Sequence, residues 1–360
     1  MADGRLTEEV SFPMKSSTIV RSVLAAGLTA GICATALAQS SPPYHLVKTV
    51  DLGGGNRWDY LSFDAPSGRV YVSHGTEVTV VDAKSGALVG NVTGLQGSHG
   101  VAIDTATGLG YADSARTKTT TVFDLKTLRP VRKTPALLDA DGMAFDKISN
   151  QVFTAGGDAN AVLATNAATN ESAKTIPVGG SPEFLVGDDA GSLYVAVNDK
   201  DQIARIDTKT NTVIAHWPTS PCVGPVGMAI DKVTRRIFSS CGDGTMAVLD
   251  ADSGKLVAHL PIGKGTDAAA FDPKRKLAFS SNRDGTLTVI AEKSPSDFAV
   301  VANVKTPLGA RTLTVDPATG RVFLVSATVE SQTPAKTPGG HPDLVFKPGS
   351  LKLFMFDPAS

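Results

Sequence analysis

Six ionisable side chains recur at nearly equal intervals along the chain. They stand 40 to 44 residues apart, and one apolar residue completes the series: Asp59, His99, Asp141, Glu183, Val226, Asp267 and Arg311. Each stands five residues before an acidic residue that ends a short apolar stretch. Charged groups at the head of apolar segments are costly to bury unless they are paired, hydrated or bound to a metal. If the fold gathers these positions, their side chains could hold a cation or an anionic ligand.

The acidic residues that follow mark a repeated unit of about 42 residues. The marks are Asp64, Asp104, Asp146, Asp188, Asp231, Asp272 and Asp316. Each unit has an apolar strand ending at the mark, a turn that an aspartate can cap, and a second apolar strand. Stretches such as 77–82 and 244–250 alternate between apolar and polar residues, as strands with two unlike faces do. Four short strands per unit are typical of a propeller blade, so seven units predict an all-β, seven-bladed β-propeller.

The two ends of the chain complement each other. The seventh unit ends with the apolar stretch 351–357 and lacks a fourth strand, whereas 44–52 has the character of one. We therefore expect this N-terminal outer strand to pair with the C-terminal strands of the last blade, which would close the ring without an open edge. An insertion at 327–350, rich in Thr, Pro and Lys, is expected to be a surface loop of blade seven.

The first 38 residues differ from the rest of the chain. A basic start, an apolar run from 23 and an A-x-A ending at 36–38 are typical of a secretory signal peptide. Residues 1–13 carry no such pattern, and Met14 is the alternative start. A membrane-spanning helix needs about 18 strongly apolar residues, and this run is shorter and rich in Ala and Gly. We expect a periplasmic or secreted protein without a membrane anchor, with a single propeller domain over residues 39–360.

Charge and cysteine content narrow the partners. Beyond residue 38 the chain carries 31 basic and 32 acidic residues. Because there is no basic excess, no general electrostatic attraction to nucleic acid or anionic lipid is expected. A monomer is also expected. Two cysteines remain in this part, Cys222 and Cys241. In an exported protein such a pair predicts one disulfide, with two buried thiols as the alternative.

The innermost strand of each blade comes first, so the ionisable residues should surround the mouth of the central channel. The turn after each mark predicts that the position five before it lies across from the position ten after it. The predicted neighbours are Asp59 with His74, His99 with Ser114, Glu183 with Asn198, Asp267 with Asn282, and Arg311 with Ser326. Cys241 lies on the same rim, where a bond to Cys222 would stiffen the entry loop of blade five.

This predicted ring suits metal binding or anion binding. The candidate metal ligands are Asp59, Asp141, Glu183 and Asp267. Converging carboxylates suit Ca²⁺ or Mg²⁺, and two imidazoles, His74 and His99, shift the choice toward a transition metal. The candidate ligand-binding residues are Arg311, Asn198, Asn282 and Trp58. The alternative is a hydrated channel in which Arg311 pairs with Asp267 or Asp59.

The chain resembles the exported bacterial YncE-like, YVTN-repeat family of seven-bladed propellers. The resemblance is carried by RWDYL at 57–61, RVYVSHGTEVTVVD at 69–82, GSHG at 97–100, SPEF at 181–184, PCVGP at 221–225, SNRDG at 281–285 and GART at 309–312. It implies the fold and export. Most members have no assigned activity, and one member type is associated with DNA binding in the periplasm. More distant propellers are metal-dependent lactonases, or lyases that use a His and Mg²⁺.

Three functional hypotheses follow. The first is an exported propeller that binds a metal ion or a small anionic ligand at the channel mouth. The second is a metal-assisted lactone hydrolase or lyase in which His99 or His74 is the catalytic base, the carboxylates hold the cation and Arg311 orients the substrate. The third is a scaffold that binds protein or DNA on a blade face.

Overall fold

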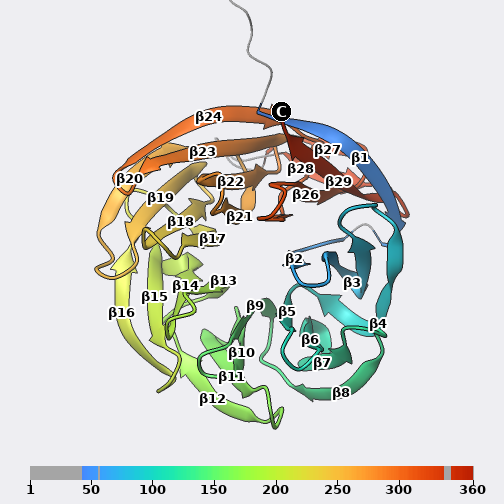
Figure 1. Ribbon diagram of the computed structural model, residues 1–360, viewed down its shortest axis with the longest axis vertical. Helices are drawn as coiled ribbons and strands as arrows, with labels where there is room; N and C mark the ends of the chain where they lie inside the picture. The colour runs from blue at the N-terminus through green and yellow to red at the C-terminus, as the bar shows by residue number, and fades with distance from the viewer. Residues whose placement is uncertain (1–42, 56, 336–341, 360) are drawn as a thin grey trace, which may run out of the picture. The chain divides into compact units, whose positions relative to one another are not determined.

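The computed structural model describes residues 43–55, 57–335 and 342–359. The predicted leader, residues 1–38, lies outside the described residues. Residues from 43 onward form seven radial β-sheets around a central channel (Figure 1), which confirms the predicted seven-bladed propeller. Of the described residues, none lies in a helix that is long and apolar enough to cross a membrane.

Each blade is a small antiparallel sheet. Blade 1 contains β2 (Leu61–Asp64), β3 (Arg69–Asp82) and β4 (Leu88–Ser98), and β3 pairs with β2 through its first half and with β4 through its second. Blade 2 contains β5 (Val101–Asp104), β6 (Leu109–Ser114), β7 (Thr119–Asp124) and β8 (Pro130–Pro135). Blade 3 contains β9 (Ala140–Asp146), β10 (Gln151–Gly156), β11 (Ala161–Asn166) and β12 (Ser172–Pro177). Blade 4 contains β13 (Pro182–Gly187), β14 (Ser192–Val197), β15 (Gln202–Asp207) and β16 (Thr212–Pro218).

The remaining blades follow the same order. Blade 5 contains β17 (Pro225–Asp231), β18 (Arg236–Cys241), β19 (Thr245–Asp250) and β20 (Leu256–Pro261). Blade 6 contains β21 (Thr266–Asp272), β22 (Leu277–Asn282), β23 (Thr286–Ser294) and β24 (Asp297–Lys305). Blade 7 contains β25 (Leu313–Val315), β26 (Val322–Ser326), β29 (Leu351–Pro358) and, as its outer strand, β1 (Tyr44–Gly53). Two 3₁₀ turns, η1 (Ala115–Thr117) and η2 (Asn198–Lys200), connect strands in blades 2 and 4.

The repeated aspartates stand at the ends of strands, where each caps the turn that follows. In blade 2 the Asp104 carboxylate accepts hydrogen bonds from the Ala106 and Thr107 amides at 3.0 and 3.3 Å, and from the Thr107 hydroxyl at 2.6 Å. Asp82 does the same for the amide and hydroxyl of Ser85, each at 2.6 Å. These bonds hold the chain reversal between two strands and explain why the sequence repeats there.

The ring is closed by strands from both ends of the described chain. β1 runs antiparallel to β29, with Tyr44 opposite Pro358 and Val50 opposite Leu353. Arg321 of blade 7 pairs with Asp357 at 2.6 Å and donates a hydrogen bond to the Ala83 carbonyl of blade 1 at 2.9 Å. Strand pairing therefore completes blade 7, and the hydrogen bond from Arg321 to the Ala83 carbonyl links blade 7 to blade 1.

The apolar core lies between neighbouring blades. At the seam of blades 1 and 7, for example, Val70 and Val72 pack with Phe323, and all three are fully buried. Aromatic rings occupy equivalent places elsewhere, such as the stacked Phe238 and Phe271 of blades 5 and 6, with centroids 5.2 Å apart. This packing fixes the inner strands, whose first residues surround the channel.

The insertion of blade seven is more ordered than the sequence suggests. Residues 327–350 were expected to form a surface loop, but they contain a two-stranded sheet of β27 (Val329–Thr333) and β28 (Asp343–Phe346). Phe346, at the end of β28, packs edge-on against Trp58 with ring centroids 4.7 Å apart. The hairpin thus reaches the residues at the head of blade 1.

Candidate functional site

The ring positions of blades 3 to 6 stand at β-bulges, whereas Asp59, His99 and Arg311 precede the inner strands of blades 1, 2 and 7. In blade 3, Ala140 pairs with Gly156 and Met143 with Thr154, so Asp141 and Gly142 together oppose the single residue Ala155. The same two-against-one arrangement involves Glu183 in β13, Val226 in β17 and Asp267 in β21. A bulge bends its strand and re-aims a side chain. The extra residue explains how an acidic side chain at the head of an apolar strand comes to face the channel.

The bulge of blade 6 also corrects one predicted cross-strand pair. The sequence places Asp267 across from Asn282, but the structure pairs Asn282 with Thr266, one residue earlier. Asn282 is fully buried and its amide donates to the Thr286 hydroxyl at 3.0 Å and the Thr288 hydroxyl at 3.1 Å. Its side chain thus bonds within blade 6, and Asn282 is not among the residues that line the pocket.

Other predicted neighbours also bond elsewhere. The Asn198 amide donates to the Pro225 carbonyl at 3.3 Å, which links blades 4 and 5. The Ser114 hydroxyl accepts from the Gln96 amide at 3.4 Å, and the Ser326 hydroxyl donates to the Leu308 carbonyl at 2.7 Å. These residues hold connecting segments around the mouth.

His74 is not brought to the ring. Its Nε2 lies 2.6 Å from the Thr79 hydroxyl and 3.8 Å from the nearest Glu77 carboxylate oxygen, and the side chain is 1% exposed. Burial lowers the pKa of His74, and the Glu77 charge opposes that shift. The predicted pair of imidazoles at the mouth is therefore reduced to one.

His99 lies between two carboxylates from the neighbouring blades. Its Nδ1 is 3.2 Å from Asp59 Oδ2 of blade 1 and 3.3 Å from Asp141 Oδ1 of blade 3. The three ligand atoms lie within 4.8 Å of one another. All three side chains are partly buried, His99 being 32% exposed and the two carboxylates about half as much. The Asp59–His99–Asp141 cluster is thus assembled from three consecutive blades.

Arg311 makes the second charged contact of the ring. Its Nε lies 2.6 Å from Asp267 Oδ2, an ion pair whose angle does not meet hydrogen-bond geometry, and Nη2 donates to the Trp58 carbonyl at 3.2 Å. Its guanidinium carbon is 6.0 Å from the centre of the Trp58 ring. The pairing of Arg311 with Asp267 is the one expected for a hydrated channel.

The ring nevertheless has more carboxylates than cations. Going round the channel, blades 6, 7, 1, 2, 3 and 4 contribute Asp267, Arg311, Asp59, His99, Asp141 and Glu183. If all are ionised, the ring has four negative and two positive charges, so two carboxylates lack a counter-charge. Missing positive charge in a partly buried site is supplied by protons or by a bound cation.

The pKa values of the ring residues reflect this shortage of positive charge. Burial, together with the Asp267 charge, raises the pKa of Asp59 to about 7. Burial also raises the pKa of Asp141 well above its ordinary value and, with the Asp267 charge, raises that of Glu183. Burial opposes the protonation of His99, but the Asp141 and Asp59 carboxylates outweigh it and raise the His99 pKa to about 9. The metal-free ring therefore retains protons at neutral pH.

Asp113 lies directly behind His99 and was not singled out from the sequence. Its Oδ1 accepts hydrogen bonds from the His99 and Gly100 backbone amides, both at 2.7 Å. The side chain is fully buried, and burial raises its pKa to about 7. Asp113 lies within β6, where one polar residue in an alternating strand gives no distinctive signal. Its role is to position the backbone that carries His99.

Two aromatic side chains meet across the channel. Tyr60 follows Asp59 in blade 1 and Phe184 follows Glu183 in blade 4, and their rings meet edge to face with centroids 4.9 Å apart. Tyr60 is 5% exposed, and burial with the nearby ring carboxylates raises its pKa well above the ordinary value. Burial is the first cause of the raised pKa values of Asp59, Asp141 and Glu183, and these two rings lie among the residues around them.

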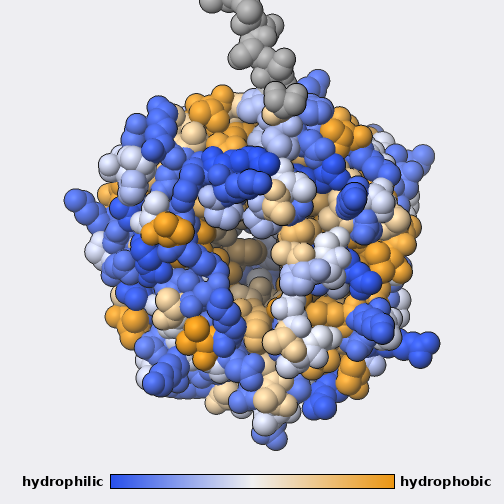
Figure 2. Space-filling model, in the orientation of Figure 1, coloured by the Kyte–Doolittle hydropathy of each residue, from blue (hydrophilic) through white to orange (hydrophobic). Residues whose placement is uncertain are grey.

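A pocket of about 750 Å³ opens at this ring. Asp59, His99 and Arg311 contribute to its lining, together with Trp58 and with Arg283 from the loop after β22. Figure 2 shows that the molecular face is hollowed at its centre, where the inner strands surround the channel. A cavity of this volume accommodates a small organic molecule.

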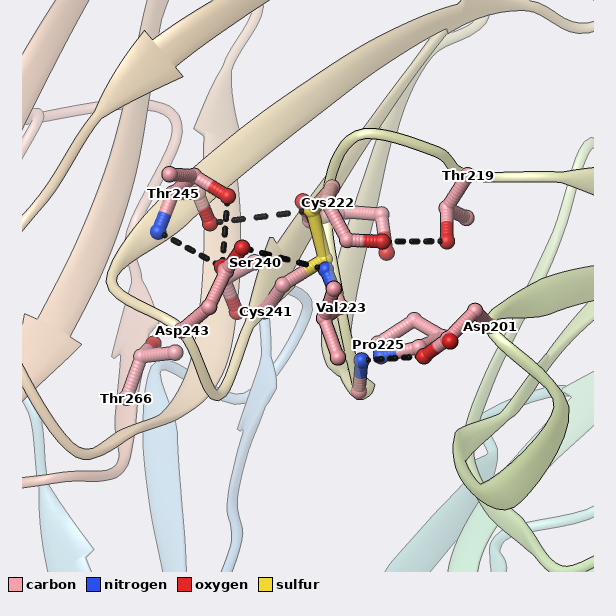
Figure 3. Close-up of a disulfide and its surroundings, with 12 residues drawn as sticks. Asp201, Thr219, Cys222, Val223, Pro225, Ser240, Cys241, Asp243, Thr245 and Thr266 are labelled. Carbon is pink, nitrogen blue, oxygen red and sulfur yellow. Dashed lines mark hydrogen bonds between the residues drawn. A yellow bond between two sulfur atoms is a disulfide. The ribbon is translucent and has the colours of Figure 1, made fainter. Parts of the chain in front are cut away.

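Cys222 and Cys241 form a disulfide beside this rim (Figure 3), as predicted. Their Cα atoms are 5.8 Å apart and both side chains are fully buried. The following loop is held by Asp243, which accepts from the Val223 amide at 3.2 Å, and by Asp201, which accepts from the Gly224 amide at 2.7 Å. Cys222, Cys241 and Asp243 lie close enough to hold a metal ion. Because both sulfurs are used in the disulfide, the two cysteines offer no thiolate ligand there.

Comparisons with known proteins support the fold. A scan against protein-family models finds no match, and a search of the curated proteins finds none either. Among solved structures, the chain is similar to Kuenenia stuttgartiensis hydrazine synthase, at 15% identity and a TM-score of 0.66 over 84% of this chain and 98% of that one. The WD40 repeats of RRP9 match at 9% identity and a TM-score of 0.71, covering 88% of this chain and 99% of that one. U3-55K matches at 9% identity and a TM-score of 0.70, covering 89% of this chain and all of the other. At these identities the likeness shows the β-propeller fold alone.

Proposed function

We propose that the protein is an exported β-propeller that binds one divalent metal ion at the mouth of its channel, with Asp59, His99 and Asp141 as ligands. The observation that carries the proposal is the convergence of these three side chains, whose ligand atoms lie within 4.8 Å of one another. The surrounding ring has two more carboxylates than cations, so a divalent ion would supply the missing charge.

The donor set favours particular metals. One imidazole nitrogen and two carboxylates suit Mn²⁺ and Zn²⁺ better than Ca²⁺, which takes six to eight oxygen ligands. His99 must lose its proton to act as a ligand, so the cation competes with protons for the site. Asp113 supports the site from behind by fixing the His99 backbone.

Metal titration of chelator-treated protein tests this function. We expect one Mn²⁺ or Zn²⁺ per chain by calorimetry, and we expect Asp141→Asn to weaken binding at least about tenfold, because it removes a ligand. Asp158→Asn is the matched control, since Asp158 is an exposed carboxylate on the same pocket. Equal affinity in the two variants would refute the assignment.

A metal-assisted hydrolase or lyase is the second candidate. It is favoured by the pocket of about 750 Å³, which gives a substrate room beside His99 and Asp59. With His99 on the metal, Glu183 is the remaining acid–base candidate, because its pKa is raised and it is outside the ligand cluster. Metal-dependent lactone turnover that is lost in Glu183→Gln, with metal binding retained, would support this activity.

Export is the other part of the proposal. The leader pattern over residues 1–38 and the disulfide between Cys222 and Cys241 both support it. Expression of the full chain in a bacterium, followed by N-terminal sequencing of the periplasmic protein, should give a start at Gln39. A cytoplasmic protein that retains its leader would contradict the export proposal and leave the metal proposal unchanged.

A further inference from the structure

A positively charged and aromatic subsite lies beside the proposed metal site. Four arginines line the pocket: Arg57, Arg116, Arg283 and Arg311. Three aspartates, Asp59, Asp139 and Asp158, line it as well, so the arginines are in excess by one. Trp58, Phe346 and Leu344 contribute apolar surface to the same pocket. Oxyanions and apolar groups are the two ligand chemistries that such a lining recognises.

Arg283 and Arg311 each have a buried Nε that makes no hydrogen bond among the described residues. The Arg283 side chain lies within electrostatic reach of Arg311, which together with burial lowers the Arg283 pKa, while the Asp343 and Asp267 carboxylates oppose that shift. Two nearby guanidinium groups repel each other, and an anion between them would relieve the repulsion.

Arg311 is held in place by its partners. Nε contacts Asp267 and Nη2 donates to the Trp58 carbonyl, so the guanidinium is fixed by two partners. Its side chain also lies over the Trp58 ring. A guanidinium fixed in this way binds a carboxylate or phosphate with little loss of side-chain freedom.

The aromatic side of the subsite is built from two distant parts of the chain. Trp58 is 5% exposed, and its indole Nε1 is buried without a hydrogen-bond partner among the described residues. Phe346 of the β27–β28 hairpin packs against it at 4.7 Å. The insertion of blade seven therefore supplies part of the pocket wall beside the arginines.

We infer that this subsite binds a small organic anion, with its carboxylate or phosphate group between Arg283 and Arg311 and its apolar body against Trp58, Phe346 and Leu344. The inference rests on the proposed function in placing a ligand in the same pocket, and it uses none of the three metal ligands. The hairpin is then the element that selects the apolar body.

Fluorescence of Trp58 provides the test, since the chain has only two tryptophans. The full chain is expressed, chelator-treated and titrated with benzoate, phenyl phosphate, inorganic phosphate and neutral benzamide. We expect benzoate or phenyl phosphate to bind saturably and benzamide to bind at least about tenfold more weakly, because the charged group is lost. If only phenyl phosphate binds saturably, the subsite takes a phosphate monoester. If only benzoate does, it takes a carboxylate.

Matched arginine variants locate the anion. Arg283→Gln should weaken binding at least about tenfold, and Arg283→Lys should restore part of it because the charge returns without the planar fork. Arg129→Gln, which removes an exposed arginine outside the pocket, should bind as the wild type does. Phe346→Leu should weaken phenyl phosphate more than inorganic phosphate.

Three results would overturn the inference: no saturable binding of any probe up to its solubility limit, equal affinity for benzoate and benzamide, or wild-type affinity in Arg283→Gln. The metal proposal is judged separately by the Asp141→Asn titration. Arginine-dependent anion binding in a protein that binds no metal would support the subsite and reject the metal site. Metal binding without anion binding would support the metal site and reject the anion subsite.

Discussion

The strongest energetic prediction concerns His99 in the metal-free protein. Replacing it with Gln removes the cation between Asp59 and Asp141. The folded-state pKa of His99 is raised from 6.5 to about 9, so its charged form is favoured by folding. Its contribution to stability is therefore fully present below pH 6.5 and is lost as the pH rises through 9.

The expected size follows from the pKa shift. A rise from 6.5 to about 9 corresponds to roughly 3 kcal/mol at about 1.4 kcal/mol per unit. His99 is 32% exposed, and solvent screening reduces this value. The carboxyl groups also take up protons once the cation is gone. We expect His99→Gln to lower the free energy of unfolding by about 1–2 kcal/mol below pH 6.5.

Denaturant unfolding of chelator-treated protein, at several pH values from below 6.5 to above 9, measures this contribution. The difference between wild type and His99→Gln should shrink toward zero at the upper end. His259→Gln, which replaces an exposed histidine on an outer strand outside the ring, is the matched control. A His99→Gln difference that is constant with pH, or that grows as the pH rises, would refute the assigned charge pairing.

Three further predictions concern the contact between two blades, the disulfide and a buried carboxyl group. Gly142→Ala should lower the free energy of unfolding by about 1–3 kcal/mol, because the new methyl carbon would lie 2.8 Å from a backbone carbonyl oxygen of blade 4. Gly187→Ala, whose new methyl carbon would have its nearest neighbour at 4.0 Å, should change the free energy of unfolding little in the same assay. Replacing Cys222 and Cys241 with Ala should lower stability by about 3 kcal/mol, and reductant should then have no further effect. Burial raises the pKa of Glu292, so folding favours its protonated form and the free energy of unfolding falls as the pH rises above 4.5. Glu292→Gln should remove that part of the pH dependence. The same pH dependence in the variant and the wild type would contradict the prediction.

The blade architecture was predictable because its signal is periodic. Aspartates that cap turns, such as Asp104 and Asp82, recur with every blade, and each holds a chain reversal through local hydrogen bonds. Their spacing therefore follows directly from the size of a blade. The ring position was found by the same periodicity, since residues at one place in a repeat occupy equivalent places in space.

The partners of the ring were not predictable, because a bulge changes the register without changing the repeat. A regular hairpin would place Asp267 opposite Asn282, and one extra residue moves that pairing to Thr266. Where glycine follows the ring position, as Gly142 does, it permits the close approach between blades.

The Tyr60–Phe184 contact and the inferred anion subsite both depend on contacts between distant segments of the chain. Tyr60 and Phe184 meet across the channel from blades 1 and 4, and nothing in either local sequence indicates the other. Likewise Phe346 comes from an insertion that has no counterpart in the other blades. Such contacts follow from ring closure and from the path of one hairpin, neither of which periodicity specifies.

The central claim is that Asp59, His99 and Asp141 hold a metal ion. Anomalous diffraction from crystals of the chelator-treated protein soaked in MnCl₂ tests it most directly. We predict one strong anomalous peak between His99 Nδ1 and the two carboxylates, absent in Asp141→Asn crystals soaked in the same way. A peak at another place, or none at saturating Mn²⁺, would contradict the account.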